Sequence, residues 1–496
     1  MGCETRVKGW IRLAAALAGL SLLAGCGARN DEGPVLVSVI GGTPTPVDPN
    51  RIPPGPAQSA LLGATAQGLV AFDATGQVEP GLAERWIVTD DGLSYIFRLR
   101  RLRWDNGKPV TATEVARHLR AAIAAGSRNP LKHALEAIDE IVVITPEVLE
   151  IRLSTPRPPL LQLLAQPELA ILAGGKGLGP FRATAHKGYV TLDPLPEPVD
   201  ADEDPAPIPP ERSLVLRGER TALAVARFAN RDIDLVLGGS AADLAIARVA
   251  NLPARQLRFD LADGLFGLAV VQQDGFLKDA ANRRALAMAV DRQAIVNAFA
   301  VPGWQPAVAI LPARFRSSAD PALPDWAALP LDSRRQTAND TVSRWRARQS
   351  GGMPPLRLAL PDAPGSAMLF AMIAADWRSI GIETTRVAFD ADADIRLVDR
   401  VAPADSAIWY LAALACPAPG ACDPAVADAI RAVRASPTLA ERGPRLAAAD
   451  AAVTLSAAYI PIARPIRWSL VAPRLNQFRE NPRAVHPLDR LRGKAN

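Results

Sequence analysis

The most informative part of the chain reads RWIVTDDGLSYIFRLRRLRWDNGKPVTATEVARHLRAAIAAG, residues 85–126. Its apolar side chains occupy alternate positions from Leu93 to Leu99, which is the pattern of a strand with one buried face. The triplet DDG at 90–92 is a turn sequence. It predicts a hairpin between this strand and the preceding segment RWIVT.

A helix follows the second turn of the same stretch, DNG at 105–107. Thr111 and Glu114 form a T-x-x-E capping box, in which each side chain accepts a hydrogen bond from the backbone N–H of the other residue. We therefore predict a helix that begins after Thr111 and continues to about Ala124.

Two other stretches predict strand–helix–strand units, the repeating element of α/β folds. The first is SLVLRGERTALAVARFANRDIDLVLGGS at 213–240, and the second runs from LRLALP to GIETTRVAF over 356–389. In the first unit, the helix positions expected to face a sheet are Ala222, Val225, Ala226 and Ala229. Between the two units, 279–312 predicts two consecutive helices, with Asp291 as the N-cap of the second.

The N-terminus has the three parts of an export signal. Lys8 and Arg12 precede an apolar run, and small residues follow it. The run Leu13–Gly25 has 13 residues, whereas a membrane span needs roughly 20. We therefore predict that residues 1–25 are a signal peptide and that the protein works outside the cytoplasm.

The sequence LAGC at 23–26 resembles the bacterial lipobox, in which the leader is cut before a cysteine that is then acylated. The resemblance implies that Cys26 carries a lipid anchor, and several acyl chains hold a protein firmly at a bilayer surface. A chance cysteine in a leader that is cut elsewhere is the alternative. Gly27 rather than Asp follows the cysteine, so the lipoprotein pattern gives no inner-membrane retention signal.

The four cysteines of the chain then reduce to one pair. Cys3 leaves with the leader and Cys26 takes lipid, so Cys416 and Cys422 remain, bracketing the loop CPAPGAC. In an oxidising compartment we expect these two residues to form a disulfide. Free thiols and a metal site are the alternatives, and a metal site is disfavoured because no histidine is nearby.

Composition excludes several classes of function. Hydrophobic residues make up 49% and charged residues 22%, which is ordinary for a globular protein. The length of 496 residues predicts two or three domains. The net charge is +5, of which the leader holds +2, and no dense Lys/Arg block interleaved with aromatics points to nucleic acid.

Asp390, Asp392 and Asp394 have the spacing of calcium ligands but lack the Gly and Glu of a calcium loop. We therefore expect no metal and no cofactor.

Five stretches together resemble the extracellular solute-binding proteins, family 5, of ABC importers for peptides, nickel and related solutes. In chain order they are PGLAERWIVTDDGLSYIFRLRRLRWDNGKPVTATEV, GLGPF at 177–181, RDIDLV at 231–236, DAANRRALAMAVDRQAIV at 279–296 and IGIET at 380–384. The resemblance extends over about residues 36–488, nearly the whole mature chain.

This resemblance implies an α/β fold of the two-lobe periplasmic-binding-protein type, with an extra inserted domain and a ligand cleft between the lobes. The domains carried over to this chain are a first lobe at 31–58, 172–258 and 466–496, its inserted domain at 59–171, and a second lobe at 259–465. Function in this family is capture of a solute by lobe closure, followed by docking on a membrane permease. We therefore expect a small-molecule or peptide ligand, an ABC permease as partner, a monomeric protein and no catalysis.

The candidates for ligand contact are Gly42, Thr43, Gln272, Trp304, Trp409, Tyr410 and Asp423. The first two follow the strand VLVSVI, where the family's first lobe faces the cleft. Gln272 stands near the position of a family Asn, and its amide still donates and accepts hydrogen bonds. The aromatic residues offer broad apolar contact with few lost rotamers, and lobe core is the alternative for each of them.

One departure from the family bears on the ligand. Family members that bind peptides carry a W-x-x-D-Y-x-D-P-like stretch, whose first Asp pairs with the peptide amino group. The matching region here keeps Trp409 and the pair Asp423–Pro424, but a cysteine-bracketed loop stands where that Asp would be. A buried ammonium group without a counter-charge costs several kcal/mol, which disfavours a free-amine peptide. An accessory or sensor lipoprotein of the same fold and an exported hydrolase are the alternative functions.

We expect Cys26→Ser to abolish labelling by radioactive palmitate and to release the protein from the membrane fraction, because serine does not accept the thioether-linked lipid. Cys3→Ser is the matched control and is expected to leave labelling unchanged. A Cys26→Ser protein that still sediments with membranes would contradict the predicted anchor.

Overall fold

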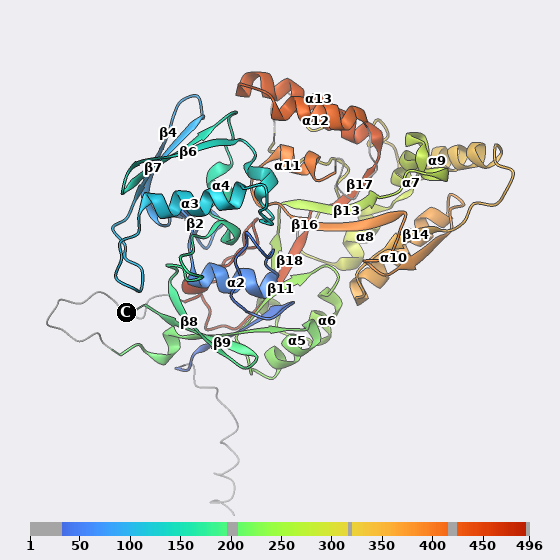
Figure 1. The fold of residues 1–496 in the computed structure, drawn as a ribbon. Coiled ribbons are helices and arrows are strands. Elements are labelled where there is room, and N and C mark those ends of the chain that lie inside the picture. The colour runs from blue at the N-terminus through green and yellow to red at the C-terminus, as the bar shows by residue number, and fades with distance from the viewer. Residues whose placement is uncertain (1–31, 196–206, 316–319, 415–423, 493–496) are drawn as a thin grey trace, which may run out of the picture.

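The computed structural model describes residues 32–195, 207–315, 320–414 and 424–492. The described part leaves out Cys26, Cys416, Cys422 and Asp423. The lipid anchor, the disulfide and the ligand contact of Asp423 therefore stay predictions. Among the described residues, three larger sheets and one two-stranded sheet are built from interleaved segments of the chain (Figure 1).

The largest sheet has seven strands and mixes parallel and antiparallel pairs. In sheet order they are β12 (Leu257–Leu261), β18 (Ile466–Val471), β11 (Leu235–Ser240), β1 (Val35–Ile40), β10 (Leu214–Glu219), β9 (Tyr189–Pro194) and β8 (Phe181–His186). Strand β1 runs parallel to both β10 and β11. The predicted unit at 213–240 is confirmed, since α5 (Thr221–Ala229) joins β10 to β11 across β1.

Helices cover both faces of this sheet. Helix α2 (Pro56–Thr65) packs on the face that carries Val37 and Val39, and α5 and α6 (Leu244–Val249) pack on the other face. The prediction for α5 is wrong in its orientation, because the buried positions are Thr221, Ala224, Val225 and Phe228. Phe228 is the largest apolar side chain of the helix, and burying it turns Ala222 and Ala226 toward solvent.

A five-stranded sheet forms the second large body. In sheet order its strands are β15 (Thr384–Val387), β14 (Leu356–Ala359), β16 (Ile395–Val401), β13 (Gly264–Val270) and β17 (Tyr459–Ala463). The helices of this part are α7 (Ala280–Ala289), α8 (Arg292–Phe299), α9 (Leu331–Arg346), α10 (Pro364–Arg378), α11 (Ala407–Ala412), α12 (Pro424–Arg434) and α13 (Leu439–Ser456). Strands β14 and β15 are parallel neighbours joined by α10, which confirms the second predicted strand–helix–strand unit.

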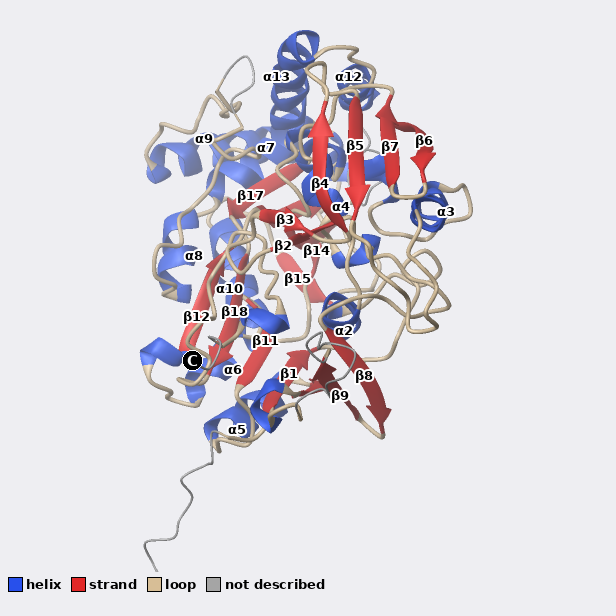
Figure 2. Ribbon diagram, turned by 90° about the vertical axis from the view of Figure 1, so that its left-hand side faces the viewer, coloured by secondary structure: helices blue, strands red, loops and turns tan. Residues whose placement is uncertain are grey.

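The stretch quoted first supplies two neighbouring strands, β4 at the edge and β5 beside it, of a four-stranded sheet, which stands apart from the seven-stranded sheet in Figure 2. In sheet order its strands are β4 (Ala83–Val88), β5 (Ser94–Leu99), β7 (Val148–Leu153) and β6 (Ile138–Thr145). The predicted hairpin is confirmed, and Gly92 takes the positive φ of 68° that its turn requires. The capping box is confirmed at the start of α3 (Ala112–Ile123). Two smaller elements accompany this sheet: the hairpin β2 (Val70–Phe72)–β3 (Val78–Pro80) and the short helix α4 (Leu160–Leu164).

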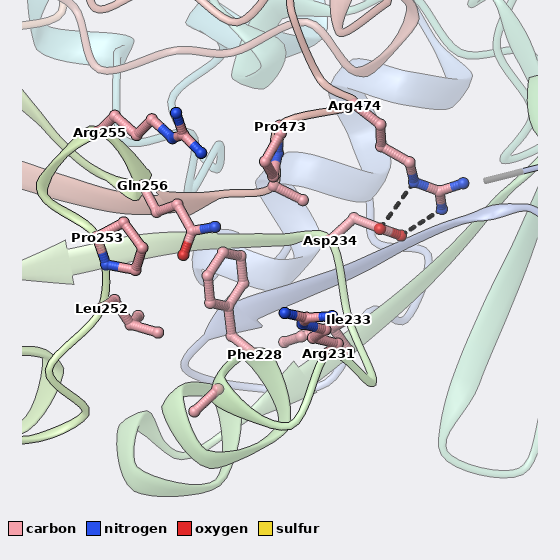
Figure 3. A pocket seen from close by; sticks show the side chains of 12 residues that line it. Phe228, Arg231, Ile233, Asp234, Leu252, Pro253, Arg255, Gln256, Pro473 and Arg474 are labelled. Atoms are coloured by element: carbon pink, nitrogen blue, oxygen red, sulfur yellow. Dashed lines mark hydrogen bonds and ion pairs between the residues drawn. The ribbon is translucent and has the colours of Figure 1, made fainter. Parts of the chain in front are cut away.

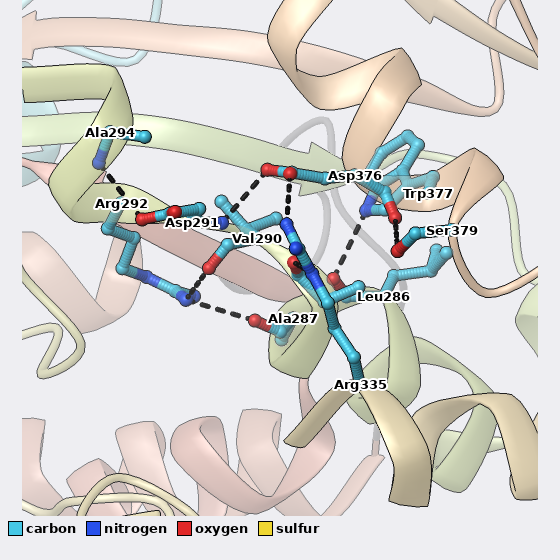
Figure 4. A network of polar contacts seen from close by, with 11 residues as sticks. Leu286, Ala287, Val290, Asp291, Arg292, Ala294, Arg335, Asp376, Trp377 and Ser379 are labelled. Atoms are coloured by element: carbon cyan, nitrogen blue, oxygen red, sulfur yellow. Dashed lines mark hydrogen bonds and ion pairs between the residues drawn. The ribbon is translucent and has the colours of Figure 1, made fainter. Parts of the chain in front are cut away.

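A polar network fixes the corner between α7 and α8 (Figure 4). Asp291 caps α8 as predicted, since its carboxylate accepts the N–H of Ala294 at 2.9 Å. Asp376 of α10 accepts the N–H of Asp291 at 2.9 Å and pairs with Arg335 of α9 at 2.5 Å. Burial of Arg292 lowers its pKa to about 9, and the positive charge of Arg334 acts in the same direction. The network ties four helices together.

The chain passes between the seven-stranded and five-stranded sheets at two points. Residues 262–263 join β12 to β13, and residues 464–465 join β17 to β18. The two crossovers lie side by side, because the N–H of Ala262 donates to the carbonyl of Pro465 at 3.0 Å. Each crossover is only two residues long, so the two sheets are held close to each other here. The predicted domain boundaries stay a prediction.

In the described part of the chain, no helix has the length and apolar character needed to cross a membrane.

Thr111→Ala is expected to lower the free energy of unfolding by about 1 kcal/mol, because it leaves backbone N–H groups of α3 without their cap. Urea denaturation measures the change. Thr113→Ala is the control, since Thr113 is exposed in the first turn of the same helix and alanine is the better helix former there. Equal losses in the two variants would contradict a role for the cap.

Candidate functional site

Asp405 is the centre of a polar junction between the sheet bodies. It lies four residues beyond the end of β16, and its side chain and backbone both bond to Gln162 of α4. The N–H of Asp405 donates to Oε1 of Gln162 at 2.6 Å, and Nε2 of Gln162 donates to Oδ2 of Asp405 at 2.8 Å. A second glutamine of the same region, Gln166, donates to the carbonyl of Pro403 at 2.5 Å. These bonds attach the region of the four-stranded sheet to the five-stranded sheet.

Two arginines neutralise the Asp405 carboxylate. Arg483, whose side chain is only 3% exposed, approaches Oδ1 at 2.5 Å. Arg314 pairs with the same oxygen and with Asp263 of the first crossover, the latter at 2.7 Å. Burial alone would raise the pKa of Asp405, but the hydrogen bond from Gln162 and the charges of Arg483 and Arg314 hold that pKa below its ordinary value.

A contact of another kind joins the bodies at the carboxyl ends of the parallel strands. Just beyond β11, the carbonyl of Ala242 accepts the N–H of Gly365, in the first turn of α10, at 2.8 Å. A Cβ atom on Gly365 would lie 2.2 Å from the carbonyl oxygen of Ala241. This close approach therefore requires glycine, and the seven-stranded and five-stranded sheets touch here as well as at the crossovers.

A cavity of about 820 Å³ lies against the seven-stranded sheet, and we call it the central cavity. Its floor is the sheet face with Val39, Leu237 and Ser469, from three neighbouring strands. Its walls are α2, the hairpin β2–β3, the segment 100–103 after β5, and the C-terminal segment 483–490. Ligand sites in proteins commonly have volumes of roughly 300–1,000 Å³, so this cavity is the candidate functional site.

None of the six predicted ligand residues that the structure describes lines the central cavity. Gly42 and Thr43 are exposed beyond the end of β1. Gly42 lines a smaller hollow of about 340 Å³, between the ends of β1 and β10. Gly41 and Gly42 have φ of 99° and 77° there, and the carbonyl of Gly42 lies so close to Gly218 that a side chain at Gly218 would collide with it.

Trp304 occupies the core. It is 6% exposed, packs between Phe266 and Phe299, and donates its indole N–H to the carbonyl of Arg464 at 2.7 Å. This placement corresponds to the core alternative, because the ring is buried against two aromatic side chains and its N–H already has an acceptor. It links α8 to the second crossover and leaves the predicted ligand contact without support.

Gln272 and the aromatic pair Trp409–Tyr410 lie at opposite ends of the strands of the five-stranded sheet, so they do not form one site. It follows Val270, which pairs with Ile395 at the start of β16, whereas Trp409 and Tyr410 follow the end of β16. A seven-residue strand such as β16 separates its ends by about 20 Å. The Gln272 amide is engaged with Asp392 at 2.7 Å. The structure therefore does not bring Gln272 together with the aromatic pair.

The aromatic pair on α11 divides into a buried and a half-buried ring. Tyr410 is fully buried against Phe315, and its burial raises the pKa of the phenol. Trp409 is partly exposed, and the guanidinium of Arg400 lies 5.3 Å from the centre of its ring. Tyr410 is thus core, while a ligand contact by Trp409 stays a prediction.

Three residues of the junction were not among the predicted site residues: Asp405, Gln162 and Arg483. The sequence offered one indication of Asp405: it is an acidic residue soon after the apolar strand IRLVDRV, and it lies closer to that strand than the cysteine-bracketed loop at 416–422 does. Nothing in the spacing of the sequence relates Asp405 to Gln162, because 243 positions separate them.

A further hollow of about 540 Å³ lies where β11 and β12 begin and β18 ends (Figure 3). Its walls carry Arg255 and Gln256 on one side and the buried pair Asp234–Arg474, 2.5 Å apart, on the other. Asp234 also accepts the N–H of Leu36 at 2.7 Å. The ion pair fastens the ends of β11 and β18 to β1, so its role here is structural.

The described residues contain no group of three or more His, Cys, Asp or Glu side chains arranged to hold a metal ion.

Comparison with known proteins identifies the family. The model of the bacterial extracellular solute-binding proteins, family 5 middle part, matches residues 77–399. The chain belongs to this family. The predicted family and the predicted fold class are confirmed, the latter by the solved structures that superpose on the chain.

The relatives of this family 5 protein are binding proteins. It is 31% identical over 150 residues to the probable deoxycholate-binding periplasmic protein YgiS of Escherichia coli (strain K12), covering 25% of this chain and 27% of YgiS. It is 24% identical over 365 residues to the periplasmic oligopeptide-binding protein OppA of the same strain, covering 67% of this chain and 66% of OppA. The aligned part thus spans about a quarter of one relative and about two thirds of the other.

The fold of the family 5 protein also matches a solved structure. The crystal structure of Haemophilus influenzae OppA in complex with RPPGFSPFR superposes with a TM-score of 0.76 at 16% identity, covering 93% of this chain and 99% of that one. At this identity the likeness establishes the fold alone.

Asp405→Asn is expected to lower the free energy of unfolding by about 1–2 kcal/mol, because it removes a charged acceptor from two arginines and a glutamine. The stabilisation by the carboxylate is present above about pH 4 and is lost as the pH falls through the depressed pKa of the folded state. Denaturation of both proteins between pH 3 and pH 7 measures this, and the two curves should converge at the acid end.

Asp362→Asn is the matched control, because Asp362 is fully exposed and lies 3.5 Å from Arg386. Such surface pairs contribute about 0–1 kcal/mol. A difference between the wild type and Asp405→Asn that stays constant down to pH 3 would contradict the ionised junction.

Proposed function

We propose that this protein is the lipid-anchored solute-binding component of an ABC importer. The observation that carries the proposal is the membership of the chain in family 5 together with a cavity of about 820 Å³ beside the polar junction. In this proposal the protein captures a small solute and presents it to a membrane permease, without chemical conversion of the solute.

The proposed ligand is a peptide-like or other small polar solute. Relatives named for oligopeptide and deoxycholate binding support this range, as does an OppA structure that holds the peptide RPPGFSPFR. The central cavity has the volume of a site for a small molecule or a short peptide.

Capture by closure would use the two crossovers as a hinge. Residues 262–263 and 464–465 are the connections between the seven-stranded and five-stranded sheets, so small changes in their backbone angles would turn one body against the other. The bonds that such a rotation would make or break are those of Gln162 and Gln166 to the 403–405 segment and that of Gly365 to Ala242. A ligand held between the two bodies would favour the closed arrangement, whereas the five-stranded body contributes only Val401 to the central cavity.

Anchoring would follow removal of residues 1–25 and acylation of Cys26, which would hold a monomer at a membrane surface outside the cytoplasm. A disulfide between Cys416 and Cys422 belongs to the same proposal, since an exported protein folds in an oxidising compartment.

The test is a thermal-shift screen of the mature chain, residues 26–496 with Cys26→Ser, against dipeptides to pentapeptides, opines, sugars, metal chelates and bile acids. A ligand at 100 times its Kd adds about 2.7 kcal/mol to the free energy of unfolding, which shifts the melting temperature by several degrees. Small-angle scattering should show a smaller radius of gyration with the same ligand. If no compound raises the melting temperature, the solute-binding proposal fails.

A further inference from the structure

We propose that one edge of the seven-stranded sheet lies on the surface of a bilayer that contains anionic lipids. We call this edge, where β1, β11 and β12 begin, the amino edge. The inference rests on the lipid anchor of the proposed function and names a second contact with the same membrane. It follows from the place where the described chain begins, from an exposed apolar segment, and from the charges around that segment.

The amino edge is formed by strand ends that lie side by side. Strand β1 is parallel to β11, and both β11 and β12 are antiparallel to β18. The beginnings of β1, β11 and β12 therefore share one edge with the end of β18. The crossovers follow β12 and precede β18, so the amino edge is the end of the sheet away from the crossovers.

The described chain begins at the amino edge. Arg474, which follows β18, donates to the carbonyls of Gly33 and Pro34 at 3.0 Å and 2.8 Å. Cys26 precedes Gly33 by seven positions, and seven extended residues span at most about 25 Å. A compact chain of this length is about 60 Å across. An acylated Cys26 would therefore bring the amino edge, rather than the opposite side of the molecule, to the bilayer.

An exposed apolar segment lies at the same edge. It reads VANLPAR, residues 249–255, and connects the end of α6 to β12, with Leu252 and Pro253 in the wall of the hollow of about 540 Å³. None of its residues is buried, and five of the seven are apolar. Val249 is 86% exposed, more than any other large apolar side chain that the structure describes. Apolar residues exposed together mark surfaces that contact a partner or a membrane.

The charged groups around this segment favour an anionic surface. The segments at or beside the amino edge are 32–34, 211–213, 230–234, 248–258 and 472–480. They hold seven arginines and five carboxylates, so an excess of two positive charges remains when every carboxylate among them is counted. Basic side chains close to a bilayer are attracted by anionic lipids.

Arg255 is the arginine best placed to meet lipid phosphates. It ends the apolar segment, is exposed, and makes no ion pair or side-chain hydrogen bond with any described residue. Figure 3 shows it across the hollow from Arg231, with Phe228 between the two. At a bilayer an arginine can extend its guanidinium to the phosphates while its apolar neighbours enter the boundary of the hydrocarbon.

The anchor makes even a weak contact of this kind effective. A short flexible linker gives the linked surface an effective concentration of about a millimolar at its target. A contact too weak to hold the free protein on a membrane would therefore be populated in the acylated protein. The anchor and the amino edge together would fix the orientation of the molecule on the bilayer.

The test places the environment-sensitive dye NBD in the exposed segment of the acylated protein. Val249→Cys, in a chain that also carries Cys416→Ser and Cys422→Ser, is labelled and reconstituted in vesicles of phosphatidylcholine and phosphatidylglycerol. The emission should shift to shorter wavelength, because the dye leaves water. Vesicles of phosphatidylcholine alone should give a smaller shift, and Arg255→Glu should abolish the shift on the mixed vesicles.

Leu455→Cys in the same background is the matched control for the dye. Leu455 is 78% exposed near the end of α13, which Figure 1 shows at the top of the molecule, with α6 near the bottom. Its dye should emit as it does in water. Arg101→Glu controls for the charge change, because the Arg101 side chain is 83% exposed and lies outside the amino edge. It should leave the shift at residue 249 unchanged.

Equal emission from the two labelled positions would overturn the inference. So would a shift at residue 249 that Arg255→Glu leaves unchanged, or one that is as large on phosphatidylcholine alone. A protein that takes up no palmitate at Cys26 would lose the anchor and this inference together. A screen in which no solute raises the melting temperature would remove only the solute-binding proposal.

Discussion

The rest of the structure depends on the pair of crossovers at which Ala262 donates its N–H to the carbonyl of Pro465. This hydrogen bond joins the two points where the chain leaves one sheet and enters the other. Strand β12 pairs with β18 on one side of it, and β13 pairs with β17 on the other. Because each crossover has only two residues, the register of both sheets is coupled at this point, and neither sheet can shift along its strands alone.

The same crossovers bring together groups from distant parts of the chain. Asp263 donates its N–H to the carbonyl of Pro482 at 2.9 Å, and its own carbonyl accepts the N–H of Ala402 at 2.7 Å. Arg464 reaches the carbonyl of Ile310 at 2.6 Å. The C-terminal segment, the end of β16 and the loop after α8 therefore all meet at the crossovers. Arg483 and Asp405 can pair only because their backbones are positioned by these bonds.

Charge pairing stabilises the polar groups of the junction and of the neighbouring cavity. Buried or half-buried carboxylates are stable here because arginines and amide groups surround them, as an unpaired buried charge would cost several kcal/mol. Asp260, Asp405 and Glu79 each have such a partner. The sheets and the junction thus have separate origins: apolar periodicity forms the sheets, and a few polar side chains join them.

The sequence by itself determined the elements whose hydrogen bonds close within a few residues. The hairpin of β4 and β5, the capping box of α3, the N-cap Asp291 and both strand–helix–strand units could be predicted, because turn and cap chemistry involves near neighbours in the chain. Only the tertiary structure decided which side chains meet. It rotated α5 to bury Phe228, enclosed Trp304 in the core, and joined Asp405 to Gln162 across 243 positions. Contacts of this kind arise from packing between whole elements, and the spacing of residues along the chain carries no record of them.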